Sequence, residues 1–217
     1  MFTEALRANP DLHVIAVVPM FTDQEGFLAR TPQLLGRARA MQQMADVAPG
    51  RVAIYGIENH QGTPVYVHAK VCVMDDAWAT IGSDNFNRRS WTHDSELSAV
   101  VVDPSADDHS PYARRLRLTL AAEHLDREVR DDDDDSLLEM MADCVDAAGM
   151  FTAYAESARA LDDWHDGGQV GERPPGRLRC LQPPELGRLE RAAALVPYLV
   201  LHDPDGRPRP LRRKGGF

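Results

Sequence analysis

Two short apolar runs with a helical stretch between them constrain the fold of this 217-residue chain most. Residues 13–19 and 51–57 are nearly all apolar and rich in β-branched side chains, as is typical of strands buried on both faces. Between them, Thr31-Pro32 predicts a helix start, with Thr as cap and Pro as first residue. Apolar residues then keep helical spacing until Pro49-Gly50. This order predicts an α/β fold.

Further strands are expected after the second apolar run. The patterns predict strands over residues 65–74, 78–81 and 97–102, with Asp75-Asp76 as the turn between the first two and Asp103-Pro104 ending the last. A strand, a helix, a strand and then paired strands together favour a mixed β-sheet flanked by helices.

The second part of the chain has a different composition. Helical spacing recurs over residues 111–130, 136–148 and 151–164, and residues 167–217 are rich in Pro, Gly and Arg. We expect this last segment to be an extended wrap or a partly loose tail, with one short helix near residues 185–195. The predicted division is a domain over residues 1–130 and a helical and extended C-terminal extension over residues 131–217.

Charge and cysteine content limit the partners and the compartment. The chain has 34 acidic and 24 basic residues and a net charge of -10, so nucleic acid or an anionic membrane would need a local basic patch. Arg207 to Lys214 is a candidate patch, or else an exposed tail that compensates acidic neighbours. No apolar run approaches a membrane span, and the N-terminus lacks the pattern of a secretory signal. Three widely spaced cysteines favour a reducing, cytoplasmic compartment over a disulfide framework or a zinc site.

One segment carries residues suited to phosphate chemistry. His68 and Lys70 are two apart, so on a strand they share a face, where Lys70 neutralises a phosphate and His68 attacks it. Ser83 and Asn85 also share a face if their segment is extended, and they offer a hydroxyl and an amide to the same oxygens. Glu96 is placed to accept a proton from the other ring nitrogen of a histidine.

These residues form the pattern His-x-Lys-x4-Asp-x6-Gly-Ser-x-Asn, which resembles the HKD motif of the phospholipase D superfamily. The longer stretch from His68 to Glu96 is similar to the second HKD half of bacterial phospholipase D and cardiolipin-synthase-like enzymes. The similarity extends from about residue 10 to about residue 130, and more weakly into the tail. It implies a phospholipase D-like mixed sheet flanked by helices.

The resemblance implies a two-step transfer through a covalent phosphohistidine, in which a histidine of a second HKD copy protonates the leaving alcohol. Carried over to this chain, His68 is the nucleophile or the general acid, Lys70, Ser83 and Asn85 hold the phosphate, and Glu96 orients His68. Asp75 matches the motif, but its position in the turn favours a role in stabilising the hairpin. The family uses no metal or other cofactor for this reaction, and the sequence has no cluster of ligands with metal-binding spacing.

This chain contains a single copy of the motif, because neither His60 nor His93 is followed by lysine two residues later. The second copy is expected from the mate in a symmetric homodimer, or from a missing N-terminal half of a longer two-copy protein.

Three functions compete on the sequence alone. The first is a phosphodiesterase or phosphatidyltransferase acting on glycerophospholipids, with the protein cytoplasmic or at the membrane periphery. The second is a nuclease of the same superfamily, which the acidic balance disfavours. The third is an inactive half-domain or scaffold that needs a partner chain. Steep loss of substrate binding with salt separates the second from the first.

Overall fold

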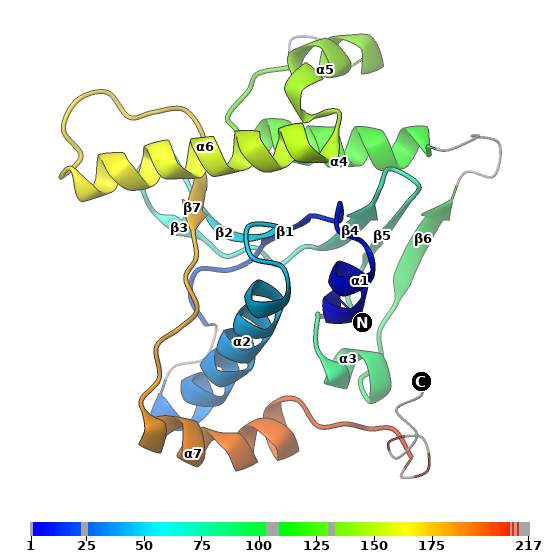
Figure 1. Cartoon of the computed structure of the whole chain (residues 1–217), viewed down its shortest axis with the longest axis vertical. Helices are drawn as coiled ribbons and strands as arrows, with labels where there is room; N and C mark the ends of the chain where they lie inside the picture. Colours follow the sequence, from blue (N-terminus) through cyan, green and yellow to red (C-terminus); the bar gives the residue numbers. More distant parts are fainter. Residues whose placement is uncertain are drawn as a thin grey trace.

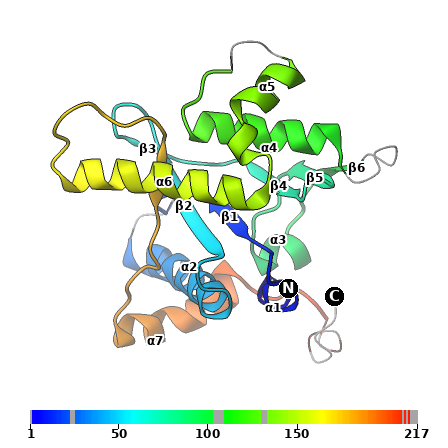
Figure 2. The ribbon, with the colours of Figure 1, turned by 45° about the horizontal axis from the view of Figure 1, so that its top comes forward.

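The chain folds into strands covered on both sides by helices, as a computed structural model gives it (Figure 1). The structure describes residues 2–22, 26–102, 109–129 and 133–208, together with residues 210 and 212. Helices α4 (Pro111–His124) and α6 (Ala147–Asp166) lie on one side of the strands, and α1 (Phe2–Ala8) and α2 (Phe27–Val47) lie on the other (Figures 1 and 2). The predicted α/β class, with a sheet flanked by helices, is confirmed.

The two apolar runs form parallel neighbours. Strand β1 (Val14–Val17) pairs with β2 (Val52–Glu58), so that Val14 lies opposite Val52, and α2 connects the two strands. The helix begins five residues before the predicted first residue, Pro32. Gly26 precedes it with a φ of 94°, a conformation that glycine adopts without strain, and Thr31 is buried inside the helix rather than capping it.

Two antiparallel neighbours make this first sheet mixed. Strand β3 (Pro64–Val65) pairs with the end of β2, and so does β7 (Leu178–Cys180), which comes from the far C-terminal part of the chain. The sequence analysis did not predict β7, which is a short strand within the segment that it expects to be extended.

A separate antiparallel sheet holds the other strands. It consists of β4 (Lys70–Met74), β5 (Trp78–Gly82) and β6 (Ser98–Val102) in that order. The continuous strand expected over residues 65–74 is therefore wrong. Residues 66–69 cross from one sheet to the other, so their backbone belongs to neither ladder.

The helices of the second half begin at side chains that cap their free N–H groups. Ser110, Asp133 and Asp146 each accept a hydrogen bond from the backbone three residues later. These caps start α4, α5 (Asp134–Met140) and α6, and a short 3₁₀ helix lies at Ala142–Cys144. Helix α7 (Arg188–Pro197) continues into a π-helical turn at Tyr198–His202.

Within the described ranges, no helix is both long and apolar enough to cross a membrane.

The hydrophobic core joins both parts of the chain. Tyr55 of β2 and Leu118 of α4 are buried in one cluster with Tyr154 of α6 and Leu178 of β7. The core thus includes residues on both sides of residue 130, where the sequence analysis places a domain boundary. Helix α6 and strand β7 complete the core under the first sheet.

A partly buried histidine beside this core makes stability depend on pH. Burial lowers the pKa of His124 to about 4, from an ordinary value of 6.5, and its ring accepts or donates one hydrogen bond with the Tyr154 hydroxyl. Because the folded pKa lies below the unfolded one, stability falls as the pH drops from about 6.5 toward about 4. We expect a loss of about 2 kcal/mol between pH 7 and pH 5 from this group. Urea unfolding at both pH values measures it, and His124→Phe should reduce the loss by that amount.

Candidate functional site

The predicted nucleophile lies in the crossing between the two sheets. His68 is exposed, and its ring stacks on the ring of Tyr66 with 6.0 Å between centroids. Lys70 is the first residue of β4, and its Nζ donates a hydrogen bond of 2.7 Å to the carbonyl oxygen of His68. The lysine therefore holds the backbone of the histidine, and both residues lie at the same end of the second sheet.

Pairing across the second sheet brings the other motif residues to the end of the sheet where Lys70 lies. Lys70 pairs with Gly82 on β5, and Gly82 pairs with Ser98 on β6. A Cβ atom on Gly82 would overlap Ser98, including its Cα, so only glycine allows the strands this approach. Because Ser83 follows Gly82 and Glu96 lies two residues before Ser98, both come to the edge where Lys70 begins its strand.

Ser83 and Glu96 are joined directly. The Ser83 hydroxyl donates to Glu96 Oε2 at 2.6 Å and accepts a hydrogen bond from the backbone N–H of Leu97 at 3.0 Å. Hydrogen bonds from the hydroxyls of Ser83 and Ser90 hold the pKa of the Glu96 carboxyl below its ordinary value, and the charge of Lys70 acts in the same direction. Glu96 is thus an anion that fixes the Ser83 hydroxyl, and its expected bond to the ring of His68 stays a prediction.

The loop after β5 leaves Ser83 and Asn85 exposed, with the less exposed Asp84 between them accepting a hydrogen bond from the Ser98 hydroxyl. The backbone N–H of Asn85 donates to Ser90 Oγ at 3.2 Å. Ser90 belongs to α3 (Arg88–Thr92), a short helix that the sequence analysis did not predict. This helix therefore sets the path of the backbone that carries Asn85.

The motif aspartate lies away from these groups. Asp75 is exposed in the predicted turn, five residues along the strand from Lys70, which corresponds to about 16 Å. Its neighbour Asp76 is buried and forms ion pairs with Arg117 at 2.6 Å and Arg114 at 3.2 Å, both on α4. Burial alone raises the pKa of the Asp76 carboxyl, but the hydrogen bonds and charges of the two arginines outweigh burial and hold the pKa below its ordinary value. Asp76, which sequence reasoning missed, attaches the hairpin to α4.

The two neighbouring aspartates should differ sharply in their effect on stability. We expect Asp76→Asn to cost about 3 kcal/mol, because it leaves two partly buried guanidinium groups without their carboxylate. Asp75→Asn should change stability by less than about 0.5 kcal/mol, since Asn also tolerates the positive φ of 51° at this position. Urea unfolding of the two variants measures the difference. Equal losses would show that Asp76 does not anchor the hairpin.

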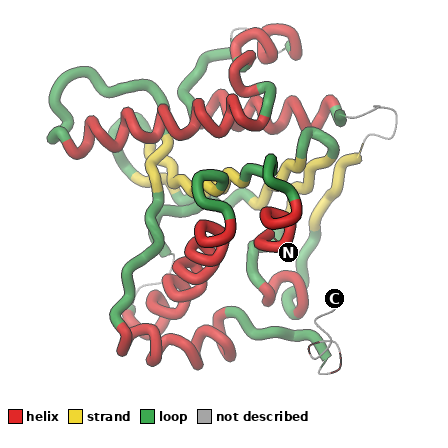
Figure 3. Tube along the Cα trace, in the orientation of Figure 1, coloured by secondary structure: helices red, strands yellow, loops and turns green. Residues whose placement is uncertain are grey.

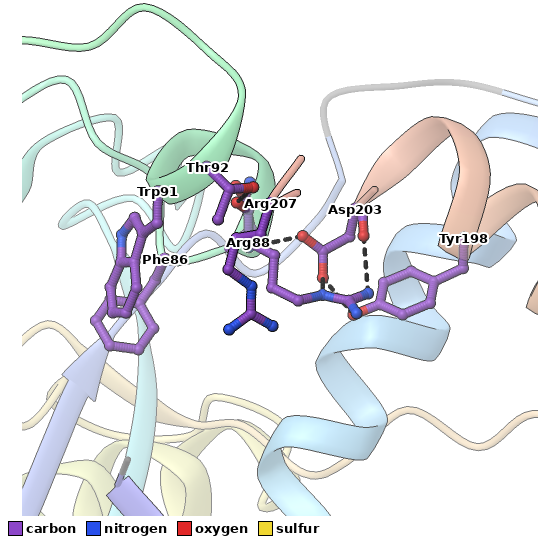
Figure 4. Close-up of a pocket in the computed structure, with 8 residues that line it drawn as sticks. Phe86, Arg88, Trp91, Thr92, Tyr198, Asp203 and Arg207 are labelled. Atoms are coloured by element: carbon purple, nitrogen blue, oxygen red, sulfur yellow. Dashed lines mark hydrogen bonds and ion pairs between the residues drawn. The ribbon is translucent and has the colours of Figure 1, made fainter. Parts of the chain in front are cut away.

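The C-terminal part of the chain holds α3 in place (Figure 4). Asp203 Oδ1 accepts hydrogen bonds from the backbone N–H groups of Arg88, at 2.7 Å, and Arg89, at 3.2 Å. Its Oδ2 accepts from Arg88 Nε at 3.0 Å and from the Tyr198 hydroxyl at 2.8 Å. A pocket of about 380 Å³ lies at this junction. It is lined by Phe86, Asn87, Arg88, Trp91, Thr92, Tyr198, Asp203 and Arg207. No local pattern predicts this contact, because 115 positions separate Arg88 from Asp203.

No group of three or more His, Cys, Asp or Glu side chains in the described part of the chain is arranged to hold a metal ion. The charged groups at the site edge are Lys70 and Glu96, with His68 beside them. That the Lys70 ammonium, the Ser83 hydroxyl and the His68 imidazole contact one ligand stays a prediction.

Comparison with known proteins shows what part of this chain is similar to. Residues 32–116 match the family described as cardiolipin synthase, PLD-like domain. A phospholipase D of Phytophthora infestans is 28% identical over 158 residues, which cover 56% of this chain and 9% of that protein. Phospholipase D1 of Schizosaccharomyces pombe is 43% identical over 81 residues, which cover 31% of this chain and 6% of that protein.

Phospholipase D zeta 1 of Arabidopsis thaliana is 38% identical over 72 residues, which cover 28% of this chain and 7% of that protein. This chain therefore spans less than a tenth of the length of these relatives. No solved structure matches the chain significantly. The matched residues 32–116 include His68, Lys70, Ser83, Asn85 and Glu96. Residues 32–116 thus match a phospholipase D-like domain, and these similarities support the phospholipase D superfamily.

Proposed function

We propose that this chain is a phospholipase D-type phosphodiesterase or phosphatidyltransferase that acts on glycerophospholipids. The observation that carries the proposal is the row of residues from Lys70 through Gly82 to Ser98. This row brings Lys70, Ser83 and Glu96 to one edge of the second sheet, beside the exposed imidazole of His68. The names of the relatives, all phospholipases D, favour a phospholipid over a nucleic acid as substrate.

In the proposed reaction, a nitrogen of His68 attacks the phosphorus of the diester. Lys70 neutralises the charge on the phosphoryl oxygens, and the Asn85 amide donates hydrogen bonds to them. Ser83 donates to them once its hydroxyl turns away from Glu96, to which it donates in the unliganded site. The bond from phosphorus to the leaving alcohol breaks, and that alcohol takes a proton from a second histidine. Water or another alcohol then attacks the phosphohistidine and releases His68. Glu96 is proposed to accept a hydrogen bond from the ring nitrogen of a histidine and so fix its tautomer.

The second histidine of this proposal comes from another HKD copy. This chain has one such motif, so the copy is supplied by the mate in a homodimer or by a separate half of a longer protein. Light scattering separates the two sources. A species of twice 24.1 kDa allows two copies of His68 to share one site, and a monomer points to a separate half.

Release of the soluble head group from phosphatidylcholine vesicles tests the substrate class. The chain should release it as a homodimer or once combined with the separate half, and DNA of mixed sequence should remain intact under the same conditions. Substrate binding should fall only weakly between low and moderate salt. Cleavage of DNA with a steep salt dependence, and no release from the vesicles, would replace the lipid assignment with a nuclease.

A further inference from the structure

Helix α7 and the π-helical turn after it carry apolar side chains on their outer side. Ala194 is buried and lies on the face that packs against α2. In contrast, Leu189, Val196 and Val200 are 86%, 66% and 63% exposed. We call these three residues, with the exposed Leu199 and Leu201, the α7 stripe. Helix α7 lies at the outer edge of the molecule, beyond α2 (Figures 1 and 3).

Two residues of the stripe, Leu189 and Val196, lie on the side of α7 opposite the packed face. At about 100° per residue, Leu189 and Val196 lie about 140° and about 160° around the helix from Ala194. A helix on the surface of a protein in water normally turns polar residues outward. An apolar outer face of this kind marks a surface that contacts another apolar phase or partner.

The charge of the same segment indicates what this surface contacts. The chain as a whole has a net charge of -10, yet its residues 188–214 include seven Arg or Lys and three Asp or Glu. One of these, Arg188, is exposed on α7 itself and lies about 100° around the helix from Leu189, on one side of the stripe. An apolar face bordered by basic residues is the arrangement that binds the surface of an anionic bilayer.

The stripe is also connected to the proposed active site. It continues into the turn that ends at His202, and the next residue, Asp203, holds the N-terminus of α3. Helix α3 in turn binds the backbone of Asn85 through Ser90. The side chains of Phe86 and Trp91 lie together beside this junction (Figure 4). A surface bound by the stripe would therefore lie on the same end of the molecule as α3 and the loop that carries Asn85.

We propose that the α7 stripe docks this protein on an anionic phospholipid bilayer. The apolar side chains enter the region between head groups and acyl chains, and Arg188 lies against the lipid phosphates. This inference deepens the proposed function, because it states how a lipid substrate in a bilayer reaches the site. The docking itself needs no catalysis, so it is measured separately from turnover.

Flotation with vesicles tests the docking. The probes are vesicles of phosphatidylcholine alone and of phosphatidylcholine mixed with phosphatidylglycerol. The full chain should float with the mixed vesicles and less with the neutral ones. The triple variant Leu189→Glu, Val196→Glu and Val200→Glu should bind the mixed vesicles at least about tenfold more weakly. The matched control is Val170→Glu, since Val170 is 82% exposed in the loop after α6 and should bind as the wild type does. Circular dichroism and thermal unfolding check that both variants fold.

Several results would overturn the docking proposal. Equal binding by the triple variant and the wild type, equal loss in Val170→Glu, or no flotation of the wild type would each do so. If the wild type does not float but is a dimer, and the triple variant is a monomer, the stripe is instead a contact with a second copy of this chain.

Turnover of a short-chain phosphatidylcholine below its micelle concentration separates the two proposals. If the wild type cleaves this dissolved substrate but does not float, the result supports the proposed function and refutes the docking surface. If the wild type floats but cleaves neither dissolved nor vesicle lipid, the result supports the docking surface and refutes the proposed function. If both hold, the triple variant should keep turnover of the dissolved substrate and lose turnover on vesicles.

Discussion

Replacing His68 with alanine is expected to lower turnover at least about 10³-fold, because the reaction then lacks the nitrogen that forms the covalent bond to phosphorus. His68 is exposed, and its ring stacks on the ring of Tyr66. The fold should therefore tolerate the change, with stability altered by less than about 0.5 kcal/mol. Head-group release and thermal unfolding of the same preparation measure the two effects.

His60→Ala is the control for this prediction. His60 is also an exposed histidine, and it forms an ion pair with Asp126 outside the proposed site. Its loss should leave turnover within about twofold of the wild type. Turnover that survives in His68→Ala, or that falls equally in both variants, would refute the assignment of His68.

Replacing Glu58 with glutamine is expected to destabilise the fold by about 3–5 kcal/mol. Glu58 ends β2 and is 1% exposed. Its carboxylate contacts Arg179 of β7 at 3.0 Å, Arg173 at 3.1 Å and His165 of α6 at 3.0 Å. The glutamine side chain has the same shape but no charge, so it leaves two arginines with little access to water beside a neutral group. Urea unfolding near neutral pH measures the loss.

An exposed ion pair on the same part of the chain provides the matched control. Glu123 is 62% exposed at its side chain and pairs with Arg177 at 2.9 Å, so Glu123→Gln should cost less than about 1 kcal/mol. Equal losses in the two variants would mean that the buried cluster does not fasten the C-terminal part to β2.

The Glu58 cluster should also contribute to acid denaturation. Burial alone raises the pKa of the Glu58 carboxyl, but hydrogen bonds from His165, Arg179 and Arg173 outweigh burial and hold the pKa below its ordinary value. A carboxyl whose pKa is lower in the folded state stabilises the fold above its unfolded pKa of about 4.3. That contribution is lost as the pH falls through the folded pKa, below the range in which His124 acts. Glu58→Gln should therefore show a shallower loss of stability below pH 4 than the wild type.

Much of the fold follows from local patterns in the sequence. The β-branched runs that form β1 and β2, the turn at Asp75-Asp76 and the helices α4 and α6 were all predicted, because each depends on neighbours within one element. Strand β7 was missed since it has only three residues and is held by pairing with β2, more than 100 positions away. The division into two sheets was missed for the same reason, because the pairing partners of residues 64–74 are not encoded in their own spacing.

The candidate site divides in the same way. The fixed spacing of the motif predicted Lys70, Ser83 and Asn85 as one group, and the longer similar stretch added Glu96. The pairing across β4, β5 and β6 brings Lys70 to the same edge as the segments that carry Ser83 and Glu96, and a common site of all four stays a prediction. Asp203 was not predicted, because its role depends on the free N–H groups of a short helix far away in the sequence. A capping aspartate of this kind is recognised only once the helix that it caps is known.

The most direct test of the proposed chemistry is to follow the phosphorus itself. The chain is incubated with a phospholipid labelled at its phosphate, quenched during turnover and digested. The label should be found on the peptide that contains His68, in a bond that is stable to alkali and labile to acid. Its absence from that peptide during sustained release of the head group, or its attachment to a different residue, would contradict the assignment of His68 as the nucleophile.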